Sequence, residues 1–81
     1  MINQLNEQNQ KQMDRIRAIK KVTGWTPQQV VNALNEAGCA ITYDTLRLTF
    51  YGYQNIRSKL MSLTLALDSI EKELRAVGYI S

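Results

Sequence analysis

Apolar residues recur along the chain at spacings of three and four, the period of an α-helix, in most of its segments. Residues 3 to 22 predict a polar helix, because Met13, Ile16 and Ile19 form one apolar stripe among Asn, Gln and charged residues. This stripe is thin. We therefore expect the first ten residues to fray, or to become ordered only against a partner.

A second helix is predicted over residues 27 to 37. Thr26 is a good N-cap, and Pro27 suits the first helical position because its missing N–H would be unpaired there anyway. Gly38 tolerates a positive φ and ends the helix. Trp25 precedes the cap and is expected to close the core, and Cys39 is expected to be buried beside the turn. The buried stripe consists of Val30, Val31, Leu34 and Ala37.

Residues 42 to 51 fit two patterns. Thr42 is a plausible N-cap for a helix with Tyr43, Leu46 and Phe50 on one face. Yet Leu46, Leu48 and Phe50 also alternate, as the residues of a β-strand do. We favour the helix, because a lone strand in a helical chain has no partner to hydrogen-bond.

The longest predicted helix covers residues 54 to 77. Its apolar residues are spaced 4, 3, 4, 3, 4 and 3 apart, which is a heptad seam of the kind that drives helices to pair. Met61 and Leu65 lie off this seam and are expected to pack on the two preceding helices. The seam consists of Ile56, Leu60, Leu63, Leu67, Ile70, Leu74 and Val77.

Together these patterns predict an all-α protein with a single structural domain. Its three segments are a polar and basic N-terminal helix (1–22), a helix-turn-helix (23–53) and a C-terminal pairing helix (54–81). A chain of 81 residues buries only about 60% of its unfolded surface, so its own core is marginal. One cysteine and no histidine exclude an internal disulfide and a Cys/His zinc site, and they leave oligomerisation as the common supplement.

The predicted C-terminal helix is long enough to imply a partner. A helix of 24 residues would span about 36 Å, which is longer than a three-helix core of this size. Part of the seam would then contact a second chain. We therefore expect a homodimer whose interface is the seam from Ile56 to Val77, with the orientation of the two chains left open.

Catalysis is poorly supported by the composition. There is no histidine to act as a general base, Cys39 has no histidine partner, and the four glycines do not form a phosphate-binding loop. We expect no enzyme, no cofactor and no metal. The chain has no apolar stretch long enough for a membrane span and no apolar signal-peptide core, so we expect a cytoplasmic protein that is not bound to membranes.

The charge of the chain is uneven. Residues 1 to 60 hold eight Lys or Arg and four Asp or Glu, whereas residues 61 to 81 hold two basic and three acidic residues. The overall charge of +3 permits nucleic acid as a partner without requiring it. The excess of positive charge lies in residues 1 to 60, where Lys11 and four further basic residues cluster between positions 11 and 21. A solvated helix face explains this cluster equally well.

The order of elements from Gly24 to Tyr53 is that of a helix-turn-helix, whose second helix enters the major groove of DNA. The residues expected to face outward carry hydroxyl groups for phosphates and an arginine that can fork onto a guanine edge. Flanking Lys and Arg would hold phosphates. Any three-helix bundle shows similar caps and stripes. The expected DNA-binding residues are Thr42, Tyr43, Asp44, Thr45, Arg47, Arg15, Arg17, Lys20, Lys21, Arg57 and Lys59.

The stretch GWTPQQVVNALNEAGCAITYDTLRLTFYGY resembles the helix-turn-helix segment of small plasmid and mobile-element DNA-binding proteins, with the KfrA-type regulators the nearest family. The resemblance covers about thirty residues. Its turn is longer than the tight three-residue form, and the coiled coil that follows is shorter than in that family. The matching positions are Val30, Leu34, Gly38, Thr42, Leu46 and Arg47.

The resemblance implies a sequence-specific binder of double-stranded DNA that acts by occupancy, as a dimeric transcriptional repressor or accessory factor of a plasmid or other mobile element. The rival interpretation is a small helical adaptor or inhibitor that binds a protein, such as a phage- or plasmid-encoded antagonist of host defence. The salt dependence of binding to random duplex DNA separates these two classes.

Overall fold

A computed structural model describes residues 2–80, with side chains from Leu5 onward; residues 1 and 81, the outermost positions of the expected end segments, lie outside it. It contains four helices, and residues 2–80 contain no strand. The all-α prediction is confirmed, and the segment with two possible patterns is a helix. The helices are α1 (Ile2–Thr23), α2 (Pro27–Glu36), α3 (Tyr43–Phe50) and α4 (Leu60–Ala76).

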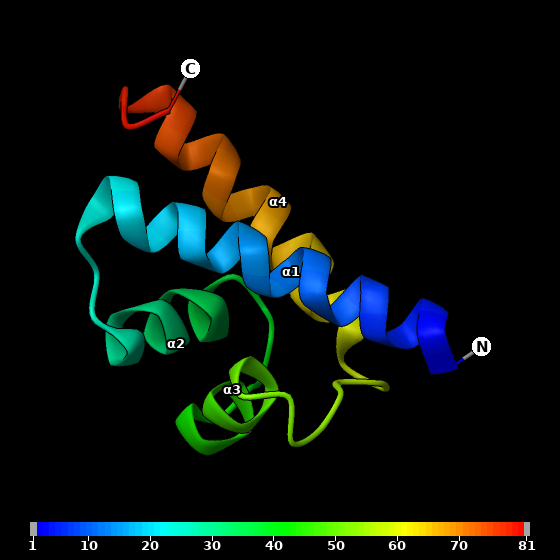
Figure 1. Ribbon diagram of the computed structural model, residues 1–81. Coiled ribbons are helices and arrows are strands. Elements are labelled where there is room, and N and C mark those ends of the chain that lie inside the picture. Colours follow the sequence, from blue (N-terminus) through cyan, green and yellow to red (C-terminus); the bar gives the residue numbers. More distant parts are fainter. Residues whose placement is uncertain (1, 81) are drawn as a thin grey trace.

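The two long helices, α1 and α4, pack against each other, and the two short helices lie on one side of this pair (Figure 1). α2 contacts the other three helices, whereas α3 packs against α1 and α2. One hydrophobic core lies between the four helices. Its buried apolar residues include Met13 and Ile16 from α1, Val30 and Leu34 from α2, and Leu46 from α3. Trp25 packs at the edge of this core and Cys39 is fully buried, as the sequence predicts.

The connection from α2 to α3 is fixed by local chemistry. Thr26 and Gln29 form a capping box, in which each side chain accepts a hydrogen bond from the other residue's backbone N–H. α2 is followed by Gly38 at φ +102°, a conformation that favours glycine. The side-chain amide of Asn35 then donates to the carbonyl of Ile41, at 3.0 Å, and pins the turn to the end of α2.

α4 begins at Leu60, six residues later than the predicted start at residue 54. Residues 54–57 have no regular secondary structure, although Ile56 keeps the heptad spacing and is buried. The reason lies in α1. The buried side chain of Asn9 accepts from the N–H of Ile56, at 2.7 Å, and donates to its carbonyl, at 3.0 Å, so these backbone groups are paired without a helix.

The heptad seam is buried inside the chain itself. Its central residues have exposed fractions of 0 to 6%, because they pack against α1 and α2. A helix of 17 residues spans only about 25 Å, so no part of it has to extend beyond the bundle. The expectation that this seam joins two chains is therefore wrong for its buried members. These are Ile56, Leu63, Leu67, Ile70 and Leu74, with Leu60 half-buried and only Val77 exposed.

The outer face of α4 also differs from the prediction. Met61 and Leu65 do not pack on the short helices: their exposed fractions are 70% and 59%. Their place on the core-facing side is taken by the seam and by Ala66, which is fully buried.

Arg15 joins the two long helices by charge. Its guanidinium donates two hydrogen bonds to Glu71, at 2.7 and 3.1 Å, and one to Asp68. The hydrogen bond to Glu71 raises the pKa of this guanidinium, and Asp68 adds to the effect. The arginine side chain is only 18% exposed. Arg15 is thus a structural residue of the α1–α4 contact.

Two kinds of feature are absent from the part of the chain that the structure describes. None of its helices has the length and apolar character that a membrane span requires. It also contains no group of three or more side chains arranged to hold a metal ion.

Candidate nucleic-acid interface

The outer face of α3 is held in place by its cap and its buried side. Thr42 caps the helix: its hydroxyl oxygen accepts from the N–H of Thr45, at 3.2 Å. Leu46 and Thr49 are buried, so the helix has one fixed orientation on α1 and α2. The opposite face exposes Tyr43, Asp44 and Arg47 to solvent. An exposed helix with this mixture of hydroxyl, acidic and basic groups is suited to hydrogen bonding with base edges or phosphates.

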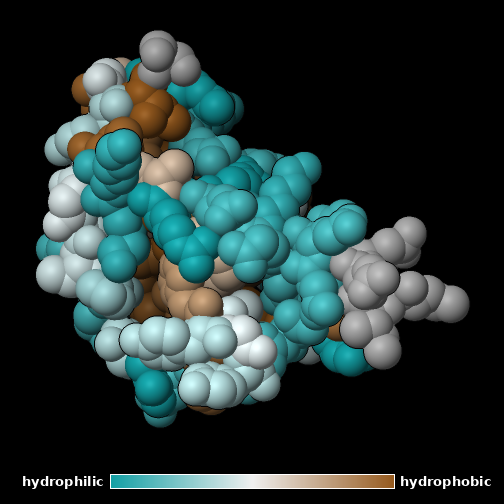
Figure 2. All heavy atoms as spheres, viewed as in Figure 1, coloured by the Kyte–Doolittle hydropathy of each residue, from teal (hydrophilic) through white to brown (hydrophobic). Residues whose placement is uncertain are grey.

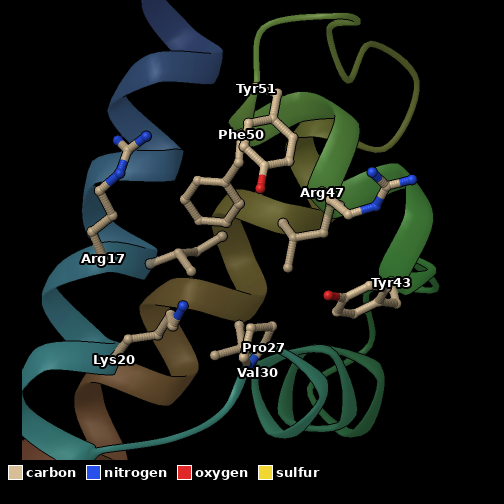
Figure 3. Close-up of a pocket in the computed structure, with 10 residues that line it drawn as sticks. Arg17, Lys20, Pro27, Val30, Tyr43, Arg47, Phe50 and Tyr51 are labelled. Carbon is tan, nitrogen blue, oxygen red and sulfur yellow. The ribbon is translucent and has the colours of Figure 1, made fainter.

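A groove of about 390 Å³ lies beside α3, between this helix, α1 and the first turn of α2 (Figure 3). Its walls are largely apolar, and its polar groups come from α1 and α3. Figure 2 shows apolar surface in a hollow below the hydrophilic side chains of α1. The lining residues are Ile16, Arg17, Lys20, Pro27, Val30, Tyr43, Leu46, Arg47, Phe50 and Tyr51.

The polar groups of the groove divide into two sets. In Figure 3 the ammonium group of Lys20 and the hydroxyls of Tyr43 and Tyr51 point into the groove. The guanidinium of Arg47 points away from it, so that only the aliphatic stem of this arginine forms part of the wall. The guanidinium of Arg47 therefore faces a partner that approaches α3 from outside, where its neighbour is the exposed carboxylate of Asp44 at 3.9 Å, whereas Lys20 faces a partner inside the groove.

Arg17 is shared between two neighbours. Its guanidinium carbon lies 5.0 Å from the centre of the Phe50 ring, within the range of a cation–π interaction. The same group makes an ion pair with Asp14, at 2.8 Å, in which both side chains are about half exposed. Such an exposed pair contributes only about 0–1 kcal/mol, so a phosphate group could replace the carboxylate at little cost.

The expected DNA-binding residues thus fall into two groups. The structure gathers Tyr43, Arg47, Arg17 and Lys20 around one groove, with Thr42, Asp44 and Thr45 on the same helix or at its cap. The others are used or placed differently: Arg15 is held by carboxylates, the ammonium group of Lys59 donates to the carbonyl of Ala40, and Lys21 and Arg57 are exposed residues that do not line the groove.

The sequence pattern did not predict the groove. It placed Phe50 on one face with Tyr43 and Leu46, but it connected neither Phe50 nor Tyr51 with α1. A signal was present, since residues 43, 47 and 51 are spaced by four and lie on one stripe of a helix. The contribution of Pro27 and Arg17 depends on how three helices pack, which no local spacing reveals.

A second groove, of about 500 Å³, lies where α2 meets the end of α4. Its apolar wall includes Trp25, Leu74 and the exposed side chains of Val77 and Tyr79. Its charged side chains are Glu36 and Glu73, so it differs in charge from the groove beside α3.

Comparisons with known protein families, with curated proteins and with solved structures find no match for this chain.

Proposed function

We propose that this protein binds double-stranded DNA and presents α3 to the major groove. The observation that carries the proposal is the position of Arg47. It lies on the exposed face of a short capped helix, and its guanidinium points outward from the protein. An α-helix with its side chains is about 10–12 Å in diameter, so α3 fits across a major groove about 12 Å wide.

The basic residues of α1 support the same orientation. Arg17 and Lys20 flank α3 across the groove, so a DNA duplex that receives α3 would pass its phosphates beside them. The cation–π contact with Phe50 already holds the Arg17 guanidinium at this edge. Arginine and lysine at such positions contribute affinity that does not depend on base sequence.

The proposed complex does not use the heptad seam as a dimer interface. A pair of chains cannot form through Leu63, Leu67 and Ile70 without opening the core, because these residues are buried in the single chain. A homodimer on DNA would need another surface, and Val77 and Tyr79 are exposed apolar residues that remain for it. Occupancy of an operator would then make the protein a transcriptional repressor or an accessory factor of a mobile element.

The test is a selection from a pool of random duplexes, followed by affinity measurements on the enriched sequence. We expect one sequence to be enriched and Arg47→Gln to weaken binding to it by about 1–3 kcal/mol. Arg75→Gln is the matched control, since this arginine is also exposed but lies in the last turn of α4. The proposal fails if no sequence is enriched, or if the two variants bind equally well.

The groove between α2 and the end of α4 favours a second candidate function, that of an adaptor or inhibitor that binds a protein. Trp25 and Tyr79 give this groove an aromatic wall, and Glu36 and Glu73 would attract a partner with basic side chains. A protein of this class would bind random duplex DNA weakly and with little dependence on salt. A DNA-binding protein would lose affinity steeply as salt rises.

A further inference from the structure

We infer that the groove beside α3 is a binding site for a small organic anion with an apolar body, such as an aromatic carboxylate. DNA binding does not account for this groove. Phosphates require cations and hydrogen-bond donors, but they have no use for a cavity with apolar walls. The groove is of the size that small-molecule sites usually have, about 300–1,000 Å³.

The apolar part of the ligand would contact side chains from all three helices that form the groove. Ile16 from α1, Val30 from α2 and Leu46 from α3 form the floor of the groove, and their exposed fractions are only 0–2%, so they offer the ligand a closed apolar base and little free surface. Pro27 and Phe50 complete the wall. Aliphatic and aromatic side chains on several sides of a cavity favour a flat or compact apolar group over a flexible polar one.

The charged part of the ligand follows from the groups that point inward. Lys20 supplies one positive charge, and the hydroxyls of Tyr43 and Tyr51 supply two hydrogen-bond donors (Figure 3). Arg17 adds positive potential at the rim, where its guanidinium lies over Phe50. A single carboxylate can accept from an ammonium group and two hydroxyls at once. A cation would be repelled, and a neutral ligand would leave the charge of Lys20 unused.

The occupant would also regulate the proposed function, and this step rests on DNA binding as proposed above. An anion between Lys20 and the two tyrosines would neutralise positive charge next to α3 and compete with a DNA phosphate at the same edge. We therefore expect the ligand to lower the affinity for DNA, which would make it an inducer.

The experiment uses 2-naphthoate as the probe and 2-naphthalenemethanol as its neutral counterpart, with the 81-residue chain and no DNA present. Amide and methyl chemical shifts are followed by NMR during each titration. We expect saturable shifts for 2-naphthoate that are confined to residues lining the groove, and at least fivefold weaker binding of the alcohol. The inference is overturned if no shift saturates, if the alcohol binds equally well, or if the shifts map to the groove between α2 and α4.

Two matched pairs of variants separate the groove from general surface effects. Lys20→Gln is compared with Lys21→Gln, because both lysines are in the last turn of α1 but only Lys20 lines the groove. Tyr51→Ser is compared with Tyr53→Ser, because both rings are largely exposed, at 68% and 78%, and only Tyr51 lines the groove. We expect the first member of each pair to weaken 2-naphthoate binding at least fivefold and the second to leave it unchanged. Equal effects within a pair contradict the assignment.

The failure of this inference can be told apart from failure of the proposed function. Specific 2-naphthoate binding by a chain that selects no DNA sequence would leave the groove as a ligand site and remove DNA as the partner. DNA binding without 2-naphthoate binding would remove the ligand site alone. Binding of a short peptide with acidic and aromatic residues, but not of 2-naphthoate, would overturn the small-molecule inference in favour of a partner protein.

Discussion

The double hydrogen bond between Asn9 and Ile56 carries a quantitative prediction. The Asn9 side chain is 3% exposed, and it pairs with both the N–H and the carbonyl of Ile56. Asn9→Ala removes both partners at once. A buried backbone group that loses its partner costs about 1–3 kcal/mol, so the two together cost about 2–6 kcal/mol. A water molecule that enters the space left by the amide would bring the loss toward the lower end.

This loss is large in relation to the whole molecule. A chain of 81 residues has a free energy of unfolding of about 4–12 kcal/mol. Urea unfolding measures the change directly. With a dependence on urea of about 1 kcal/mol per molar for a protein of this size, we expect Asn9→Ala to lower the midpoint by about 2 M or more, or to leave no stable fold. Gln8→Ala is the matched control, because Gln8 is exposed on the same helix.

Hydrogen exchange locates the cause of the loss. The amide proton of Ile56 is protected by Asn9, and we expect its exchange to accelerate in Asn9→Ala more than that of amides within α1. Asn9→Asp keeps only the hydrogen bond from the N–H of Ile56, and its buried carboxylate would face the carbonyl of that residue without a donor, so this variant should also be clearly less stable than the original chain. If Asn9→Ala and Gln8→Ala unfold within about 0.5 kcal/mol of each other, Asn9 does not hold the segment before α4.

Three further predictions concern the core and its turn. Leu67→Ala should lower the free energy of unfolding in urea by about 2.7–5 kcal/mol because Leu67 is fully buried. Leu65→Ala, at an exposed position two residues away, should lower it by less than about 0.5 kcal/mol, and equal losses would place Leu67 outside the core. Burial raises the pKa of the Cys39 thiol above its ordinary value of 9.0, so as pH rises the thiol of the unfolded chain ionises first, and the free energy of unfolding should fall above about pH 9. A pH–stability curve that Cys39→Val leaves unchanged would contradict this. Gly38→Ala should lower the free energy of unfolding by about 1–2 kcal/mol through the positive φ alone, since no atom lies within 4 Å of the added Cβ. An unchanged thermal unfolding temperature would show that the turn relaxes.

Much of the fold could be predicted because its signals are local. Thr26 and Pro27 mark the start of α2, Gly38 follows its end, and Thr42 marks the start of α3. Each of these residues acts on backbone groups within a few positions, so its effect is the same in most folds. The apolar period then identifies the buried side of each helix, and the seam residues from Leu63 to Leu74 are buried, although inside one chain and not between two.

What could not be predicted depends on contacts between distant residues. Lys59, the N-cap residue of α4, makes no capping hydrogen bond with its side chain, so no local signal marks the boundary. The heptad spacing runs on to Ile56, and only the pairing of that residue with Asn9, 47 positions earlier, explains the unwound segment. Because α4 is shorter than predicted, no part of it has to extend beyond the bundle to a second chain.

In the candidate site, too, the position that follows from local spacing could be predicted, and the roles that depend on distant contacts could not. Arg47 could be placed on the outer face of α3 from spacing alone, and its exposure agrees. Arg15 could not be separated from Arg17 by sequence, because both are basic residues of one helix. Their different roles follow from α4, which offers Glu71 and Asp68 to Arg15, and from α3, which offers the ring of Phe50 to Arg17.

The salt dependence of DNA binding tests the central claim most directly. Fluorescence anisotropy with a labelled duplex of random sequence gives the dissociation constant at several salt concentrations. If Arg17, Lys20 and Arg47 each neutralise a phosphate or an equivalent group, the logarithm of the affinity should fall with the logarithm of salt with a slope of about −3. Arg17→Gln should reduce the steepness of this slope by about 1, and Arg75→Gln should leave it unchanged. A slope near zero, or the same slope in all three proteins, would contradict DNA binding through the face of α3.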